Sequence, residues 1–169
     1  GKSIGIVGYG NLGRAVAKVA EAFGMHVLLA KRDTEDTRPE RLALHELLPQ
    51  VDVLTLHCPL TEHNRGLIGA AELALMKHDA VLINTARGGL VDEYALLEAL
   101  KSQQIGGAGL DVLEKEPPPS GYPLLMTELP NLVITPHTAW ASLESRQRLV
   151  DEIALNIGAF KAGRPRNVV

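Results

Sequence analysis

Apolar and polar positions vary along the chain in a regular pattern that predicts strands and helices in alternation. Stretches with one apolar face predict helices at residues 12–23, 38–48, 70–75, 93–101 and 143–160. Residues 114–130 are rich in proline, and regular structure is expected to end there. Short apolar runs predict strands at residues 3–7, 26–30, 51–57, 80–84, 107–112 and 132–135.

This alternation predicts an α/β fold of the Rossmann type, in which helices cover both faces of a doubly wound parallel sheet. Apolar strands that are buried on both faces are typical of such three-layer α/β/α sheets. Right-handed crossovers wind the sheet outwards in both directions and place its ligand at the carboxyl ends of the strands. The whole chain, residues 1–169, is expected to form one such nucleotide-binding domain.

The first expected strand leads into Gly-Tyr-Gly-Asn-Leu-Gly at residues 8–13, a Gly-x-Gly-x-x-Gly sequence. Gly8 permits the tight turn after the strand, Gly10 lets a pyrophosphate approach the backbone, and Gly13 lets the helix pack close to the strand. The first turn of that helix offers free N–H groups and the positive end of its dipole to an anion. With a strand before it and a helix after it, this run predicts a dinucleotide site.

Composition excludes several classes of protein. Hydrophobic residues make up 46% of the chain and charged residues 22%, as in soluble globular proteins. A net charge of −3 provides no basic field for nucleic acid, and no apolar run is long enough to cross a membrane. No signal peptide is expected before the first strand, and Cys58 is the only cysteine, which favours a cytoplasmic location. No metal site is predicted.

Three candidate chemical groups follow three successive expected strands. Arg87 precedes two glycines and can present its guanidinium group to a carboxylate. Glu116 stands before a rigid proline segment, and His137 follows a proline as a candidate acid–base group. Each alone has a plainer interpretation, as a surface arginine, a solvated acidic loop or an exposed histidine. Their shared position at strand ends favours a single site.

Together these motifs resemble the nucleotide-binding domain of the D-isomer-specific 2-hydroxyacid dehydrogenases. The resemblance covers essentially all of the chain, and its most specific parts are Ala-Arg-Gly-Gly-x-Val-Asp at 86–92 and Pro-His at 136–137. The Pro-His-x-Ala-Trp run looks more like the glycerate dehydrogenase/hydroxypyruvate reductase branch than the phosphoglycerate dehydrogenase branch. The other matching runs are residues 8–13, 57–61, 84–93, 109–112 and 116–117.

The resemblance implies hydride transfer between a nicotinamide cofactor and the 2-position of a small 2-hydroxy or 2-keto acid, such as hydroxypyruvate or glyoxylate. His137 would exchange a proton with the substrate oxygen. Glu116 would hydrogen-bond the imidazole, orient it and favour its charged form. Arg87 would bind the substrate carboxylate and help to polarise the adjacent carbonyl.

The resemblance also implies where the cofactor binds. The backbone of Asn11 and Leu12 would meet the pyrophosphate, while Cys58 and Pro59 would lie near the adenosine. A catalytic role for Cys58 is therefore not expected, and ordinary packing remains an alternative for Trp140. The positions close to the nicotinamide or the substrate would be Thr85, Ala86, Arg87, Asp111, His137, Ala139 and Trp140.

The end of the second expected strand departs from the pattern of members that prefer NAD(H). Such members carry an acidic residue there to bind the ribose hydroxyls, whereas this chain has Lys31 followed by Arg32. Two adjacent cations suit a 2′-phosphate, and Arg32 could stack on the adenine. NADP(H) is therefore favoured. If both side chains point into solvent, or if Asp33 swings in, NAD(H) remains usable.

The length of the chain is the second departure from the family. Full members carry a further domain that forms the other wall of the substrate cleft, and we expect that domain to be absent from residues 1–169. The chain is then expected to bind dinucleotide, to pair as a homodimer through this domain, and to turn over poorly alone. Two alternatives remain open: a dinucleotide-sensing interaction protein related to transcriptional corepressors, and a Rossmann binding module without chemistry.

Overall fold

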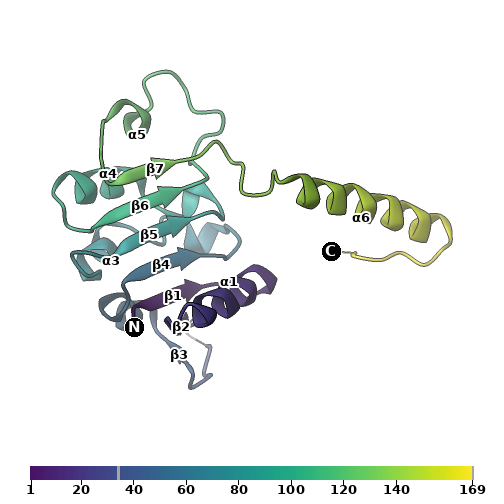
Figure 1. Ribbon diagram of the computed structural model, residues 1–169, viewed down its shortest axis with the longest axis horizontal. Coiled ribbons are helices and arrows are strands. Elements are labelled where there is room, and N and C mark those ends of the chain that lie inside the picture. The colour runs from purple at the N-terminus through teal and green to yellow at the C-terminus, as the bar shows by residue number, and fades with distance from the viewer. Residues whose placement is uncertain (34, 169) are drawn as a thin grey trace. The chain divides into compact units, whose positions relative to one another are not determined.

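A computed structural model describes residues 1–33 and 35–168 of the protein. The chain divides into two compact units, Gly1–Pro136 and His137–Val169, which are described separately. The first unit contains the sheet and five helices of the described residues, and the second contains the long helix α6 (Leu143–Lys161) (Figure 1). Val169, the last residue of the expected domain, lies outside the described residues.

Within the described residues, the first unit is built on a parallel sheet of seven strands in the order β3-β2-β1-β4-β5-β6-β7. The chain winds outwards from β1 in both directions, which confirms the predicted doubly wound Rossmann fold. The change of direction between β1 and β4 creates the crevice in which such sheets bind their ligands. The strands are β1 Ser3–Val7, β2 His26–Ala30, β3 Arg41–Leu42, β4 Val53–Leu56, β5 Val81–Asn84, β6 Gly107–Leu110 and β7 Leu132–Ile134.

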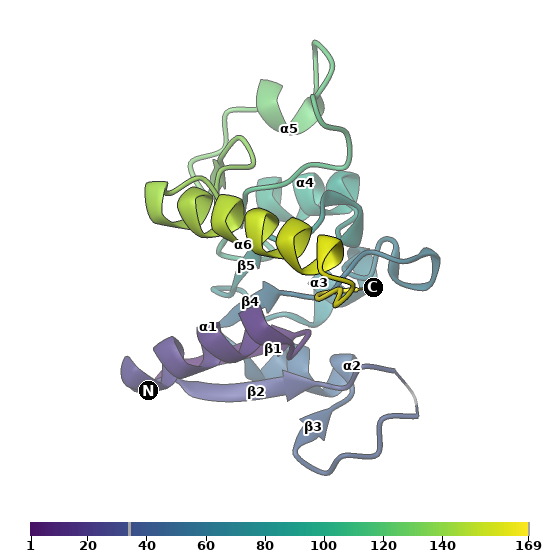
Figure 2. The ribbon, with the colours of Figure 1, turned by 90° about the vertical axis from the view of Figure 1, so that its right-hand side faces the viewer.

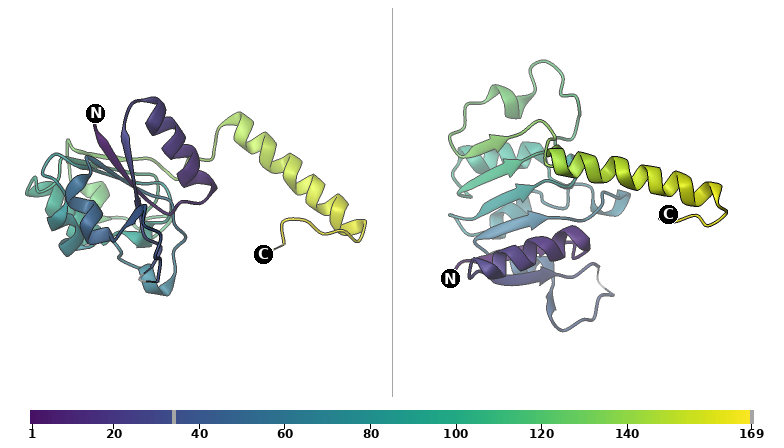
Figure 3. Two further views of the ribbon diagram at one scale, coloured as in Figure 1. Left: turned by 90° about the horizontal axis from the view of Figure 1, so that it is seen from below. Right: turned by 45° about the vertical axis from the view of Figure 1, so that its right-hand side comes forward.

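Two hydrophobic cores lie on the two faces of the sheet. On one face, Ile4 and Ile6 of β1 pack against Ala17 and Ala20 of α1 (Asn11–Ala22). On the other face, a larger core joins the sheet to α2 (Leu44–Leu47), α3 (Ala70–Leu75) and α4 (Glu93–Lys101). Figures 1 and 3 show α1 on one side of the sheet and the blue and teal helices on the other. The larger core includes Val7, Leu47, Leu54, Leu73, Leu82 and Leu96.

The prediction of a helix over residues 38–48 is wrong for the first half of that segment. Arg41–Leu42 instead form β3, which pairs with β2 at the edge of the sheet (Figure 2). The N–H of Lys31 donates to the carbonyl of Leu42 at 2.8 Å, so the sheet satisfies backbone groups that a helix would have to satisfy internally. Helix α2 then begins only at Leu44, and a 3₁₀ turn at Leu48–Gln50 follows it.

The expectation that residues 114–130 lack regular structure is also wrong in part. A short helix, α5 (Pro123–Met126), lies within this segment. Pro123 occupies its first turn, where the missing N–H removes no intrahelical hydrogen bond, and Leu124 is buried beneath it. Proline therefore starts a helix here rather than preventing one. Two further 3₁₀ turns occur in the first unit, at Glu62–Asn64 and Gly88–Leu90.

Candidate functional site

The glycine loop between β1 and α1 has the geometry predicted from its three glycines. Gly8 has a φ of 95°, and a Cβ there would stand 2.5 Å from the backbone of His57. A Cβ on Gly13 would stand 2.1 Å from the carbonyl oxygen of Gly8, so only glycine lets α1 begin this close to the turn. A Cβ on Gly10 would meet no described atom within 4 Å. Gly10 therefore faces open space.

Helix α1 begins beside this open space, with Gly10 as its N-cap. No side chain of the described residues caps the helix, and Asn11 and Leu12 in its first turn are exposed. Uncapped N–H groups and the positive end of the helix dipole together suit an anion. The loop thus fits the pyrophosphate of a dinucleotide.

The segment after β4 forms the other side of the glycine loop. The N–H of His57 donates to the carbonyl of Val7 at 2.7 Å, which ties this segment to the end of β1. Burial raises the pKa of the Cys58 thiol, which disfavours the thiolate that a nucleophile requires. Asn64 donates to the carbonyl of Pro59 at 2.8 Å and braces the exposed turn. The surroundings of Cys58 give it no chemical activation.

Lys31 and Arg32 directly follow β2. Lys31 is half-buried, whereas the side chain of Arg32 is 83% exposed and its Nε lies 3.6 Å from a carboxylate oxygen of Asp33. The N–H of Arg32 donates to the carboxylate of Asp36 at 3.0 Å. Two cations therefore directly follow β2, the position at which NAD-binding sheets of this type carry the carboxylate that binds the ribose hydroxyls.

Asn84, the last residue of β5, supports the loop that carries Arg87. Asn84 is completely buried, and its amide nitrogen donates to the carbonyl of Arg87 at 2.9 Å. Its amide oxygen accepts from the N–H of Ala86 at 3.0 Å. Arg87 itself is exposed, and its Nη1 donates to the carbonyl of Ala86 at 2.6 Å. Asn84 was not among the residues predicted for the site, although a polar residue at the end of an apolar strand can indicate a buried side chain that supports the next loop.

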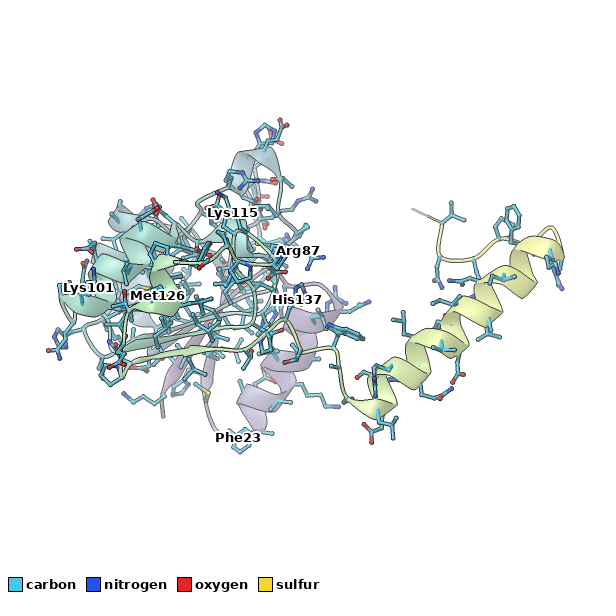
Figure 4. The ribbon with its side chains drawn as sticks, turned by 90° about the horizontal axis from the view of Figure 1, so that it is seen from above. Phe23, Arg87, Lys101, Lys115, Met126 and His137 are labelled. Carbon is cyan, nitrogen blue, oxygen red and sulfur yellow. The ribbon has the colours of Figure 1, made fainter. Side chains whose placement is uncertain are left out.

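The loops that follow β5 and β6 are in direct contact. A Cβ on Gly88 would stand 2.0 Å from the backbone of Leu113, so this glycine allows the two loops to touch. Figure 4 shows Arg87 and Lys115 on these adjoining loops. The structure therefore brings the Arg87 loop beside the segment that leads to Glu116.

A carboxylate of α4 anchors the loop after β6. Glu93 accepts hydrogen bonds from the N–H of Glu114 and from the hydroxyl of Tyr122. Burial, together with the Glu93 carboxylate, raises the pKa of Tyr122. Glu116 is exposed, and its Oε1 accepts from the N–H of Leu113 at 2.8 Å. Glu93 thus holds the segment on both sides of Glu116, a function that sequence reasoning missed.

Asp111, Thr85 and Ala86 lie at the carboxyl ends of β6 and β5, where the resemblance places the nicotinamide. Asp111 is 5% exposed and accepts a hydrogen bond from the hydroxyl of Thr135, which follows β7. Thr85 is exposed and Ala86 is half-buried. These residues occupy neighbouring strand ends because β5, β6 and β7 pair in that order.

His137 begins the second unit, whereas Arg87 and Glu116 belong to the first. His137 has a φ of 52° and is exposed, as are Ala139 and Trp140. The indole N–H of Trp140 donates to the carbonyl of His137 at 2.8 Å, so this tryptophan holds the backbone of the histidine segment. That Arg87, Glu116 and His137 come together in one site remains a prediction.

Residues 1–33 and 35–168 contain neither a cluster of metal-ligating side chains nor a helix that could span a membrane. Within these ranges, no group of three or more His, Cys, Asp or Glu side chains could hold a metal ion. Among the same residues, no helix is both long and apolar enough to span a membrane.

Residues 1–139 match the family model described as the NAD-binding domain of D-isomer-specific 2-hydroxyacid dehydrogenases. The chain belongs to this family. It is 53% identical over its full 169 residues to the glycerate dehydrogenase of Methylorubrum extorquens, of which it covers 53%. The chain therefore spans about half the length of this curated relative.

Two solved structures extend the comparison to cofactors. The acyclic imino acid reductase Bsp5, in complex with NADPH and D-Arg, superimposes with a TM-score of 0.88 at 38% identity, covering 99% of this chain and 53% of that one. The D-lactate dehydrogenase of Lactobacillus jensenii, with NAD⁺, gives a TM-score of 0.85 at 33% identity, covering 99% of this chain and 55% of that one. This fold therefore accommodates either dinucleotide.

Proposed function

We propose that this chain is the cofactor-binding part of an enzyme that transfers a hydride between a nicotinamide dinucleotide and the 2-position of a small 2-hydroxy or 2-keto acid. One observation carries the proposal: the Arg87 loop adjoins the Glu116 segment at the carboxyl edge of a sheet whose glycine loop fits a pyrophosphate. Hydroxypyruvate and glyoxylate are the proposed substrates, supported by the similarity to a glycerate dehydrogenase.

In this proposal, three side chains have separate roles in the reaction. The dinucleotide, when bound, supplies or accepts the hydride. Arg87 binds the carboxylate of the substrate through its guanidinium fork and polarises the neighbouring carbonyl. His137 gives a proton to the carbonyl oxygen during reduction and removes it during oxidation, while Glu116 orients the imidazole.

Thr85, Ala86, Asp111, Ala139 and Trp140 complete the proposed surroundings of the nicotinamide. Asn11 and Leu12 meet the pyrophosphate, and Cys58 and Pro59 meet the adenosine. We further propose that residues outside this chain supply the second wall of the substrate cleft, because the chain covers about half of its curated relative. The chain alone would then bind dinucleotide and turn over slowly.

Replacing His137 in the whole protein tests the reaction. H137Q should lower kcat for reduction of hydroxypyruvate or glyoxylate by about 10²- to 10⁴-fold, the usual contribution of an acid–base group. The dissociation constant of the reduced dinucleotide should stay within about twofold, because Gln keeps the size of the side chain and the pyrophosphate site is untouched. H78Q is the matched control, since His78 is exposed and lies before β5 rather than after it. Full activity of H137Q would refute the mechanism.

We propose that NADP(H) is the preferred cofactor and that NAD(H) is usable. The support is the pair Lys31 and Arg32, which directly follows β2 at the position where members that prefer NAD(H) carry an acidic residue for the ribose hydroxyls. The experiment compares kcat/KM for NADPH and NADH in the whole protein and in a K31A/R32A variant. The variant should lose most of the NADPH preference. A clear NADH preference in the unmodified protein would refute this assignment.

We propose a homodimer that pairs through this domain and a cytoplasmic location. The dimer rests on the family resemblance, and the location rests on the single cysteine, Cys58, which is not in a disulfide. Light scattering of the whole protein tests the dimer. The corepressor-like alternative gains no support from the site or from the relatives described above.

A further inference from the structure

A buried carboxylate lies behind the two cations that follow β2. Asp36 is 8% exposed, and its carboxylate accepts from the N–H of Arg32 at 3.0 Å. Arg38 donates to it through Nε and Nη2, each at 2.6 Å, and the Nη1 of Arg41 lies 3.4 Å away. The hydrogen bonds from Arg38, followed by the one from Arg32, hold the pKa of Asp36 well below its usual range. Asp36 is therefore charged at neutral pH.

The partners of Asp36 are those that a phosphate group recruits. A backbone N–H directly after β2 and two guanidinium groups converge on one anion, which is the arrangement that binds phosphates in proteins. The Nε of Arg41 is buried and has no hydrogen-bond partner among the described residues, so one donor of this cluster is unused. The cluster therefore has the donors of an anion-binding site, and the anion that it binds is the Asp36 carboxylate of the same chain.

The cluster also borders the glycine loop. The guanidinium of Arg41 lies 5.8 Å from the ring centre of Tyr9, which stands between Gly8 and Gly10. Arg41 belongs to β3, whose pairing with β2 brings it to the same edge as Lys31 and Arg32 (Figure 2). An adenosine ribose that follows a pyrophosphate on the glycine loop reaches the end of β2 in folds of this type. The Asp36 cluster is therefore next to the expected position of the 2′-substituent.

We propose that Asp36 is an internal anion that determines how strongly this protein discriminates NADPH from NADH. The inference rests on the proposed dinucleotide site and deepens it. The carboxylate neutralises Arg38 and Arg41 and occupies the N–H of Arg32, so a 2′-phosphate competes with it for the same donors. The 2′-hydroxyl of NADH carries no charge and is little affected. Asp36 thus limits the NADPH preference that Lys31 and Arg32 confer.

Two substitutions with opposite expected effects test the proposal in the whole protein. D36N removes the charge and keeps an oxygen acceptor, so the dissociation constant of NADPH should fall about tenfold while that of NADH stays within about twofold. R38A removes a cation and leaves Asp36 less neutralised, so NADPH should bind about tenfold more weakly. The dissociation constant of NADH should again change little. Fluorescence titrations at low and high salt measure both constants, and the gain in D36N should shrink at high salt.

The control is a carboxylate of the same kind at the amino ends of the strands, away from the carboxyl ends where the dinucleotide is expected. Asp52 accepts from the N–H of Ser3 at 2.6 Å and pairs with Lys2 and Lys77, yet it precedes β4 rather than following β2. D52N should leave the ratio of the dissociation constants of NADPH and NADH unchanged. If D36N and R38A weaken both dinucleotides in parallel, or leave their ratio unchanged, Asp36 only supports the loop and the proposal is overturned.

The same measurements separate this proposal from the proposed cofactor preference. The ratio in the unmodified protein and in K31A/R32A tests whether the two cations favour NADPH. The change of that ratio between the unmodified protein and D36N tests Asp36. A protein that prefers NADH can still shift towards NADPH in D36N, so either proposal can fail while the other stands.

Discussion

The buried side chain of Asn84 holds the backbone on both sides of the exposed Arg87 side chain. Its amide donates to the carbonyl of Arg87 at 2.9 Å and accepts from the N–H of Ala86 at 3.0 Å. Both bonds lie where β5 ends, so the sheet sets the position of a side chain that leaves it. An exposed arginine on a rigid loop loses little backbone entropy when it binds a carboxylate.

Removing the Asn84 amide should weaken both the fold and the substrate site. N84A leaves two part-buried backbone groups, the N–H of Ala86 and the carbonyl of Arg87, without their partner, which should cost about 1–3 kcal/mol of unfolding free energy. In the whole protein, kcat/KM for the keto acid should fall about tenfold or more, while the dissociation constant of the dinucleotide changes less. Thermal denaturation and steady-state kinetics measure these quantities.

Asn131 offers a matched control for that experiment. Its side chain also donates to a carbonyl, that of Leu100 at 3.3 Å, but Asn131 precedes β7 at the amino ends of the strands, whereas Asn84 ends β5. N131A should lower the melting temperature without a specific loss of kcat/KM. Equal kinetic losses in the two variants would mean that Asn84 acts only through stability.

Two substitutions in the glycine loop should distinguish its role in folding from its role in cofactor binding. G13A forces a Cβ to within 2.1 Å of the Gly8 carbonyl, so the variant should unfold at a lower temperature and lose dinucleotide binding. G10A meets no described atom within 4 Å, so its melting temperature should stay nearly unchanged. Its methyl group would instead occupy the space of the pyrophosphate, and dinucleotide binding should weaken at least tenfold. Normal binding by G10A would show that the pyrophosphate lies elsewhere.

Glu93 should control the loop that carries Glu116. E93A removes the acceptor for the N–H of Glu114 and for the Tyr122 hydroxyl, so the segment between them should loosen. Limited proteolysis should then cut between residues 113 and 122 faster, and kcat should fall while the dinucleotide dissociation constant stays close to its original value. E98A is a suitable control, because Glu98 lies on the same helix and pairs with exposed Lys101. Equal proteolysis of E93A and E98A would contradict this role.

Asp52 should make the fold sensitive to acid. The hydrogen bond from the N–H of Ser3, and then the one from Lys77, lower the pKa of Asp52 from 3.8 to about 2. A carboxyl whose pKa is depressed by folding stabilises the fold above its ordinary pKa, and this contribution is lost as the pH falls from about 3.8 to about 2. The melting temperature of D52N should therefore be lower than that of the parent at pH 6. The difference should disappear near pH 2, and a constant difference across this range would contradict the prediction.

Local sequence patterns were sufficient for the sheet and for the glycine loop. The strands β1 and β2 and the helices α3 and α4 occur at the predicted residues, because each combines a clear apolar period with nearby turn residues. The roles of Gly8 and Gly13 were also predictable, since a backbone turn and a close contact both exclude a Cβ. The structure of residues 38–48 was not predictable from local patterns, because the choice between helix and strand there depended on the free edge of β2.

The sequence by itself therefore determined the class of fold, the family and the strand ends at which chemistry was to be sought. Only the tertiary structure decided which side chains support those positions. Asn84, Glu93 and Asp36 act through hydrogen bonds to loops and partners whose positions the fold sets. Hydrophobic periodicity is a property of each segment alone, whereas a buried polar side chain is specified by the partner that satisfies it. That partner is defined only when the strands have paired and the loops between them have closed.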